Sequence, residues 1–245
     1  MDIKNIKKAL QHGEMVVGSE VNEVRSPAIA EIYAAAGLDF IIVDMEHTSF
    51  TFSEAAQIYR MARNCDITPL VRIPEIEYGA ICRNLDQGAH GIIVPRVTSK
   101  EEVLQVIDMM KYPPKGQRGF YPGGTVAGFR PISFADFIHD QNENTLLVVQ
   151  IESEKAVRKL DEILSIAEID VILIGPADLS LSIGHPCEFF HEEVLSLMRD
   201  IIRKCLHYDI PSGVAYADPQ LAKGWRKEGV QFFWVNSDIN MLLTG

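Results

Sequence analysis

Short apolar runs alternate with longer amphipathic segments along the whole chain. The runs have the length and the Val, Ile, Leu and Phe content of buried strands, which predicts strands at residues 15–21, 39–43, 68–71, 91–94, 146–151, 171–174, 211–216 and 231–235. Between the runs, apolar residues recur at about a 3.6-residue period. This predicts a short N-terminal helix and then helices at residues 26–36, 53–64, 77–87, 99–111, 134–139, 153–167, 188–208 and 218–227. Eight such alternations favour an α/β fold, a closed (β/α)8 TIM barrel, over an open doubly wound sheet.

Three details refine this expectation. Ser53 is expected to cap the helix that it begins. The alternation is interrupted at residues 112–131, a stretch rich in Gly and Pro whose length is typical of functional or mobile loops. After the last predicted strand and the polar residues 236–238 at its end, only residues 239–245 remain, about 10 Å of helix at 1.5 Å per residue. We therefore expect a truncated eighth helix, with something else covering the last seam of the barrel.

Composition indicates one soluble globular domain. The 245 residues suit a single barrel over residues 1–245, because such barrels commonly have about 250 residues. The formal charge of −11 argues against a nucleic-acid or anionic-membrane partner, although a local cationic pocket for an anionic substrate remains compatible with it. No apolar run approaches the ~20 residues of a membrane-spanning helix. The four cysteines have no CxxC or zinc-type spacing, so we expect a reducing, cytoplasmic environment.

Two acids follow neighbouring predicted strands. The run at 146–151 ends in Glu152, and the run at 171–174 is followed by Gly175, Pro176, Ala177 and Asp178. Since a helix connects the two strands, they are parallel and both acids lie at the same end. Hard carboxylate oxygens at one place predict a magnesium or manganese site. The alternative, for each acid taken singly, is that Glu152 caps the next helix and Asp178 shapes a turn.

Other polar residues also follow predicted strands, on the face where barrel enzymes place their chemistry. They are Asp44, Glu46, His47, Arg72, Arg96, Gln150, Ser237 and Asp238. Arg72 provides a planar cation suited to a carboxylate or a developing enolate oxygen. His47 is the candidate general acid/base, and Asp44 is placed to orient its imidazole. All eleven lysines fall in predicted helices or loops, so we expect a metal, and not a lysine imine, to act as the electron sink.

Six segments of the sequence together resemble the HpcH/HpaI family. They are VDMEH (43–47), PLVRIP (69–74), LDQGAHGIIVPRV (85–97), YPPKGQRG (112–119), VQIES (149–153) and IGPADLS (174–180). The resemblance covers nearly the whole chain. It implies a class II, metal-dependent aldolase acting on 2-oxo acids, similar to 4-hydroxy-2-oxoheptanedioate and 2-dehydro-3-deoxyglucarate aldolases, with a single catalytic barrel.

The resemblance also implies roles for individual residues. Glu152 and Asp178 would ligate a divalent cation, Mg²⁺ or Mn²⁺ with Co²⁺ as a third choice, which also chelates pyruvate. Arg72 would contact the keto or enolate oxygen, with Gln150 in the same pocket. The backbone at Ala177 and Asp178 would hold the pyruvate carboxylate.

On the aldehyde side, the resemblance implies that His47 exchanges a proton with the aldol hydroxyl through a metal-bound water. Asp44 would support it, together with Asp86 from a neighbouring subunit. Family members are typically hexamers built from two trimers, so the partners expected are a small 2-oxo acid and further copies of the chain, as a hexamer or trimer. The sequence departs from the family at residues 120–124, where small residues are usual, and at Asn236, where Gly is usual.

The implied reaction is reversible cleavage of a 4-hydroxy-2-oxo acid to pyruvate and an aldehyde through a metal-stabilised pyruvate enolate. One alternative is another pyruvate-enolate lyase, such as an oxaloacetate decarboxylase or a 3-hydroxyacyl-CoA lyase. No added CoA-binding segment is evident for the latter. The other alternative is a non-catalytic pyruvate-binding barrel.

Overall fold

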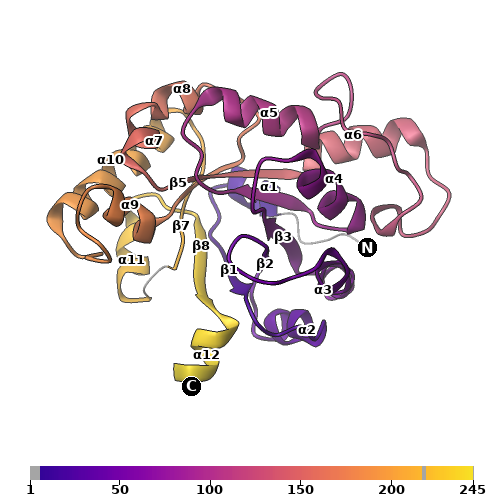
Figure 1. Ribbon diagram of the computed structural model, residues 1–245, viewed down its shortest axis with the longest axis horizontal. Coiled ribbons are helices and arrows are strands. Elements are labelled where there is room, and N and C mark those ends of the chain that lie inside the picture. Colours follow the sequence, from indigo (N-terminus) through magenta and orange to yellow (C-terminus); the bar gives the residue numbers. More distant parts are fainter. Residues whose placement is uncertain (1–5, 217–218, 245) are drawn as a thin grey trace.

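The eight predicted strands form a closed parallel barrel (Figure 1). The computed structural model describes residues 6–216 and 219–244. Its strands are β1 (Val16–Val21), β2 (Phe40–Asp44), β3 (Thr68–Arg72), β4 (Gly91–Val94), β5 (Leu146–Ile151), β6 (Val171–Ile174), β7 (Ser212–Val214) and β8 (Phe232–Ser237). Each strand pairs in parallel with the next, and β8 closes on β1. The predicted (β/α)8 barrel is therefore confirmed.

Helices connect the strands and cover the barrel from outside. They are α1 (Ile6–Gln11), α2 (Ala28–Ala35), α3 (Phe52–Asn64), α4 (Tyr78–Gln87), α5 (Lys100–Met110), η1 (Thr125–Ala127), α6 (Phe134–Asn144), α7 (Glu154–Arg158), α8 (Leu160–Leu164), α9 (Pro176–Ser182), α10 (Glu192–His207), α11 (Pro219–Lys227) and α12 (Asp238–Thr244). The start of the predicted N-terminal helix (1–5), residue 218 of the predicted helix 218–227, and Gly245 lie outside the described residues.

Two helix predictions were wrong in detail. The cap of α3 is Thr51 and not Ser53, because Thr51 Oγ1 accepts the backbone N–H of Glu54 at 3.3 Å and Glu54 returns a bond to the Thr51 N–H at 2.8 Å. The predicted helix 153–167 is two short helices, since Lys159 leaves the helical region with φ −105° and ψ 11°. Both pieces bury apolar residues against the barrel, so the apolar period runs across the break.

Alternation along the strands determines what fills the barrel. Val16, Gly18 and Glu20 share one face of β1, and the first of these lies in the interior cluster of apolar side chains. A Cβ on Gly18 would lie 2.2 Å from the ring of Phe40, so only glycine fits there. Towards the carboxyl ends of the strands, the inward positions change from apolar to charged or polar residues: Glu20, Asp44, Arg72 and Gln150. These residues place buried charge at the mouth of the barrel.

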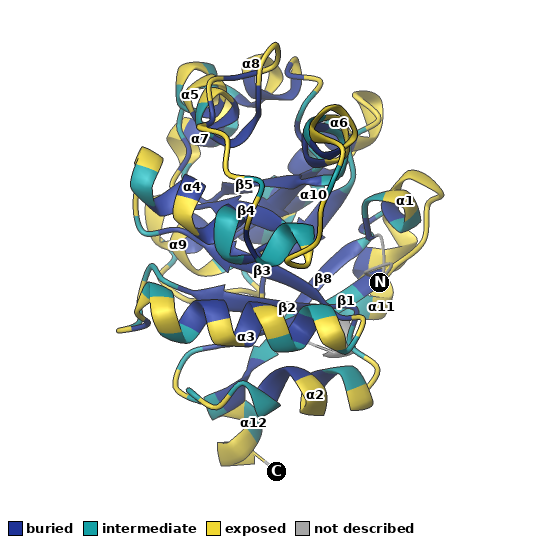
Figure 2. Cartoon of the chain, turned by 90° about the vertical axis from the view of Figure 1, so that its right-hand side faces the viewer, coloured by how far each residue is buried: buried dark blue, intermediate teal, exposed yellow. Residues whose placement is uncertain are grey.

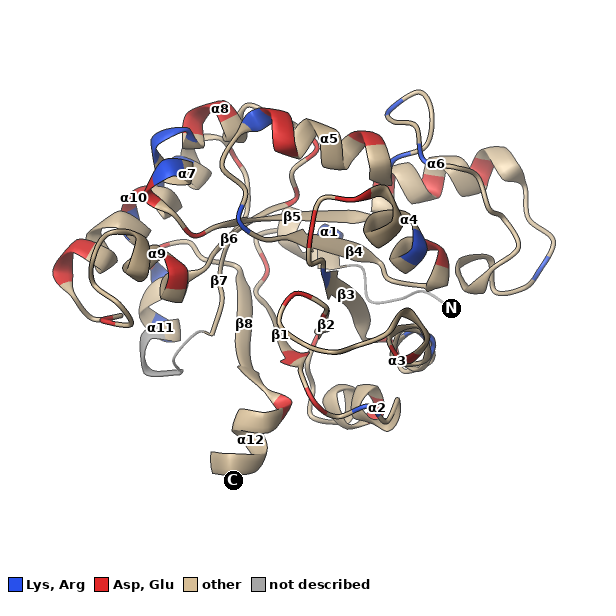
Figure 3. Cartoon of the chain, in the orientation of Figure 1, with Lys and Arg blue, Asp and Glu red and all other residues tan. Residues whose placement is uncertain are grey.

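Charge on the outside is distributed over the helices. Figure 2 shows the strands buried beneath helices whose outer faces are exposed. Acidic residues lie over α5, α8 and α10 (Figure 3). No helix of the described residues is long and apolar enough to cross a membrane.

The helix that follows β8 is short, since α12 spans Asp238–Thr244. Helix α12 contacts the ends of β1 and β8 and projects from the barrel at the C-terminal end of the chain (Figure 1). Its Leu242 and Leu243 are 71% and 79% exposed. Asp238, at its start, accepts backbone N–H groups of Asn22 at 2.9 Å and Val24 at 2.7 Å, so this strand-end acid ties the start of α12 to the loop after β1.

Candidate active site

Arg72 lies at the centre of a cluster of buried charged side chains in the barrel mouth. Its Nε and Nη2 donate to the two oxygens of Asp44 at 2.8 and 2.9 Å. The two residues are register partners on β3 and β2, which explains the bidentate pairing. Carboxylates of Glu46 and Glu20 lie 3.4 and 3.6 Å from the same guanidinium. The cluster holds one cation in a fixed orientation at the mouth.

The loop after β2 presents His47 to solvent. Asp44 accepts the backbone N–H groups of Glu46 at 3.0 Å and His47 at 3.3 Å, and its own carbonyl accepts the Thr48 hydroxyl at 2.5 Å. The carboxylate of Asp44 bonds Arg72 and the backbone of this loop, so its expected support of the His47 imidazole stays a prediction. The imidazole Nε2 lies 3.6 Å from Glu46, and the His47 side chain is 65% exposed.

Glu152 follows β5 and is buried in the same mouth. Its Oε1 accepts the backbone N–H of Arg96 at 2.5 Å, and its Oε2 accepts the side-chain amide of Gln150. Burial, together with the nearby charges of Asp178 and Glu46, raises the pKa of Glu152 to about 7. In the described part of the chain, neither Glu152 nor Asp178 forms an ion pair with Lys or Arg.

The surroundings of this carboxylate pair fit a hard divalent cation. Gly175 leaves the space open, since a Cβ there would lie 2.8 Å from both Gln150 Nε2 and Glu152 Oε2. Asp178 lies exposed in the first turn of α9, close enough for its charge to affect Glu152. Two interacting carboxylates without a cationic partner are costly, and oxygen ligands of this kind suit magnesium or manganese. The predicted metal site is thus a site that these residues can form.

Arg96 links the two halves of the mouth. It has a positive φ of 56°, which directs its N–H at Glu152. Its guanidinium donates to the carbonyl of Pro74 at 2.7 Å and lies 3.1 Å from Glu46. This bridge spans the side of the mouth between β2 and β4.

Ala177 and Asp178 lie in the first turn of α9. Backbone N–H groups in a first turn have no acceptor within the helix, so they are available to an anion. Their predicted contact with the pyruvate carboxylate is compatible with this position.

Asp86 is not beside His47 within the chain. It lies on α4, where its Oδ1 accepts Arg118 Nη2 at 2.6 Å. Arg118 is itself buried and lies 4.7 Å above the ring of Tyr112. The approach of Asp86 to His47 of a neighbouring subunit stays a prediction.

Three residues of the mouth were missed from the sequence: Glu20, Trp234 and Tyr216. Glu20 has no exposed surface, and its Oε1 accepts the hydroxyl of Tyr216. The guanidinium of Arg72 lies 4.9 Å from the ring centroid of Trp234. The sequence could have indicated Glu20, because it lies two residues after Gly18 and therefore on the same inward face of β1.

A second group of potential metal ligands lies outside the mouth. His185 Nε2 is 3.0 Å from Glu193, and the rings of His185 and His191 stack at 3.5 Å. His191 Nδ1 accepts the N–H of Glu193 at 3.3 Å and so caps α10. The positive end of a helix disfavours a cation, so these contacts are explained by capping.

The family model described as HpcH/HpaI aldolase/citrate lyase matches residues 23–244. A hydroxypyruvate/pyruvate aldolase of Sagittula stellata is 31% identical over 238 residues, 97% of this chain and 93% of that protein. A 2-keto-3-deoxy-L-rhamnonate aldolase of Salmonella gallinarum is 33% identical over 239 residues, 97% of this chain and 88% of that protein. The crystal structure of an HpcH/HpaI aldolase from Desulfitobacterium hafniense superimposes with a TM-score of 0.94 at 34% identity, covering 98% of this chain and 92% of that one.

Proposed function

Because this chain belongs to the HpcH/HpaI aldolase/citrate lyase family, we propose that it cleaves a 4-hydroxy-2-oxo acid reversibly into pyruvate and an aldehyde. The family predicted from the sequence is confirmed, and the chain is an aldolase of the pyruvate-releasing type. We place the reaction in one catalytic domain over residues 1–245. The observation that supports it most is the meeting of Glu152, Asp178 and the fixed cation Arg72 in one barrel mouth.

Aldolases of this family are typically dependent on a divalent metal ion. Here Glu152 and Asp178 would hold it, with Mg²⁺ or Mn²⁺ as our first choices and Co²⁺ as the third. When bound, the ion supplies Lewis-acid polarisation of the keto group. A lysine imine has no corresponding position in the barrel mouth, since no strand of the described barrel contains a lysine.

Arg72 has the task of stabilising negative charge on the keto oxygen. Asp44 fixes its guanidinium through two hydrogen bonds, so little reorganisation is needed when that charge develops. Gln150 would contact the same bound acid. The N–H groups at Ala177 and Asp178 would hold its carboxylate.

His47 has the task of moving the aldol proton. Its imidazole lies in an exposed loop, so it is accessible to a C4 hydroxyl, from which it takes a proton in cleavage and to which it returns one in condensation. Asp44 would support this residue, and its bond to the His47 backbone N–H already fixes the loop. Asp86 would join it from a neighbouring subunit.

We propose that the chain assembles as a homo-oligomer, a hexamer or a trimer. The exposed Leu242 and Leu243 of α12 support this, because exposed apolar side chains gathered on one short helix favour association. We place the protein in the cytoplasm, a location that the four free cysteines support.

Turnover of a panel of 4-hydroxy-2-oxo acids, coupled to pyruvate detection, tests the proposed function. We expect pyruvate release from at least one member when Mg²⁺ or Mn²⁺ is present. Oxaloacetate and a 3-hydroxyacyl-CoA thioester belong in the panel as competing substrates. Turnover of either of these without cleavage of any 4-hydroxy-2-oxo acid would contradict the proposal.

A further inference from the structure

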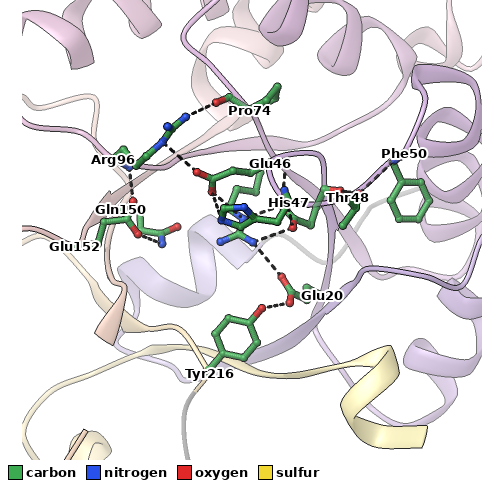
Figure 4. A network of polar contacts seen from close by, with 12 residues as sticks. Glu20, Glu46, His47, Thr48, Phe50, Pro74, Arg96, Gln150, Glu152 and Tyr216 are labelled. Atoms are coloured by element: carbon green, nitrogen blue, oxygen red, sulfur yellow. Dashed lines mark hydrogen bonds and ion pairs between the residues drawn. The ribbon is translucent and has the colours of Figure 1, made fainter. Parts of the chain in front are cut away.

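A polar pair faces the candidate metal site from across the barrel. Glu20 lies on β1, and Tyr216 follows β7. In a closed barrel of eight strands, β1 is opposite β5, whose end carries Glu152. Figure 4 shows Glu20 and Tyr216 together and apart from Gln150 and Glu152. The mouth therefore has two polar ends with Arg72 between them.

The proposed orientation of the substrate directs its aldehyde portion towards this pair. Pyruvate is bounded by Arg72 on β3 and by the residues at the ends of β5 and β6. The bridge from Arg96 to Glu46 and Pro74 spans the side between β2 and β4. The direction left for the remainder of the substrate is towards β1, β7 and β8.

In this pair, one carboxylate oxygen of Glu20 lacks a hydrogen-bond donor. Glu20 is fully buried, and in the described part of the chain its Oε2 accepts no hydrogen bond, since its nearest cation, Nη2 of Arg72, lies 3.6 Å away. Its other oxygen is used by the Tyr216 hydroxyl, whose own oxygen still has acceptor capacity. A buried acceptor left unpaired costs free energy, which a hydrogen-bonding ligand group would remove.

The charges nearby select against an anionic group. Glu20, Asp44 and Glu46 surround Arg72, and both Asp44 oxygens already bond its guanidinium. Burial raises the pKa of Glu20 to about 7, so this carboxyl is costly to charge and more costly beside another anion. A neutral hydroxyl supplies the missing donor without adding charge.

We propose that Glu20 and Tyr216 form a subsite for a hydroxyl group of the aldehyde, which makes the enzyme selective for neutral hydroxyaldehydes over deoxy and acidic aldehydes. This rests on the proposed function. It assigns specificity to two residues outside the candidate metal site, one of which, Glu20, lies 3.6 Å from the Arg72 guanidinium. Acidic semialdehydes, the products expected from diacid substrates, become poor partners.

Condensation of pyruvate with matched aldehydes tests the subsite. Glyceraldehyde, propanal and succinic semialdehyde are compared by kcat/KM, and the ratio of glyceraldehyde to propanal is the readout. We expect this ratio to exceed about tenfold in the wild type, the effect of one hydrogen bond to a buried group, and succinic semialdehyde to rank below glyceraldehyde. A ratio near one would overturn the proposal.

Substitutions of Glu20 and Tyr216 test whether these two residues cause the preference for glyceraldehyde over propanal. Glu20→Leu removes the acceptor and should lower the ratio about tenfold, whereas Glu20→Gln, which keeps an acceptor, should retain more of it. Tyr216→Phe gives an independent reading if Glu20→Leu fails to fold. Glu23→Gln, an exposed acid just beyond β1, is the matched control and should keep the wild-type ratio. Wild-type ratios in both Glu20→Leu and Tyr216→Phe would overturn the proposal.

Failure of the hydroxyl subsite and failure of the proposed aldolase function give different results. If the subsite is wrong but the proposed function is right, pyruvate condenses with the aldehydes without preference for the hydroxyl. If the proposed function is wrong, none of the aldehydes condenses with pyruvate, whether or not the methyl protons of pyruvate exchange with solvent.

Discussion

Arg72 combines a fixed orientation with a role in every step that places charge on bound pyruvate. Because Asp44 holds it through two bonds, its removal eliminates a preorganised donor. We predict that Arg72→Ala lowers both exchange of the pyruvate methyl protons and aldol cleavage by about 10²–10³. NMR in deuterated water measures the exchange, and coupled pyruvate detection measures the cleavage. Loss of cleavage alone would contradict this role.

His47 should affect the two reactions unequally. It moves the proton of the aldol hydroxyl, which is absent when only pyruvate is bound. We predict that His47→Ala lowers cleavage by about 10²-fold or more and lowers exchange much less. Because the His47 side chain is exposed, the variant should fold normally, and the melting temperature recorded beside both rates checks this. Equal losses of both activities would refute this division of roles.

Glu20 makes stability depend on pH in a defined direction. Its pKa is raised by burial from 4.5 to about 7. Between these values the folded protein keeps a proton that the unfolded chain has released, so stability is lost as the pH rises through this window. From about pH 5 to about pH 8, in EDTA, the free energy of unfolding should fall by roughly 2 kcal/mol more in the wild type than in Glu20→Gln. Parallel curves for the two proteins would contradict the burial of an ionisable Glu20.

Single residues show where the sequence was sufficient and where it was not. The positions of Glu152, Asp178 and Arg72 were predictable, because each lies at or just after the end of a strand and the strand ends share one face of a barrel. The hydrogen-bond partner of Asp44 could not be predicted from the sequence. Whether Asp44 bonds the His47 imidazole or the Arg72 guanidinium depends on the register of β2 with β3. Tyr216 was hidden because only the folded chain brings it to Glu20, 196 positions away.

The start of α3 shows how one turn of helix depends on its cap. Thr51 and Glu54 form a reciprocal capping box, whereas Ser53 lies inside the helix. We predict that Thr51→Ala lowers the free energy of unfolding by about 1 kcal/mol and that Ser53→Ala changes it by less than about 0.5 kcal/mol. Both side chains are exposed, so the pair is well matched for chemical denaturation. A larger effect at Ser53 would contradict the assigned cap.

Periodicity predicted the elements better than their ends. Strand β8 continues to Ser237, two residues beyond the apolar run, because Asn236 takes a positive φ of 53° while the strand still pairs with β1. Glycine adopts a φ of this sign more readily than other residues do. The break between α7 and α8 left no trace in the pattern, since both helices bury apolar residues against the barrel.

For the whole molecule, the exposed end of α12 predicts assembly. Light scattering after size exclusion should show a homo-oligomer, a hexamer or a trimer. Replacing both Leu242 and Leu243 with Ser should weaken the association of the subunits. Leu104→Ser, at an exposed leucine of α5, should leave that association intact. A monodisperse monomer that retains full activity at nanomolar concentration would rule out both the assembly and a role for Asp86 in a neighbouring site.

The barrel itself was readable from sequence because eight strand–helix alternations have few compact arrangements. The polar residues could be placed on one rim for the same reason. What the pattern does not contain is which of them touch, and the buried cluster around Arg72 is defined by such contacts.

The central claim is that a divalent ion held by Glu152 and Asp178 is required for pyruvate release. The most direct measurement is the rate of that release after incubation with EDTA and again after adding Mg²⁺, Mn²⁺ or Co²⁺. The account predicts loss of activity in EDTA, recovery on adding the ion in the wild type, and no comparable recovery in Glu152→Gln. Full activity in EDTA, together with inactivation by borohydride in the presence of pyruvate, would instead indicate a lysine imine and contradict it.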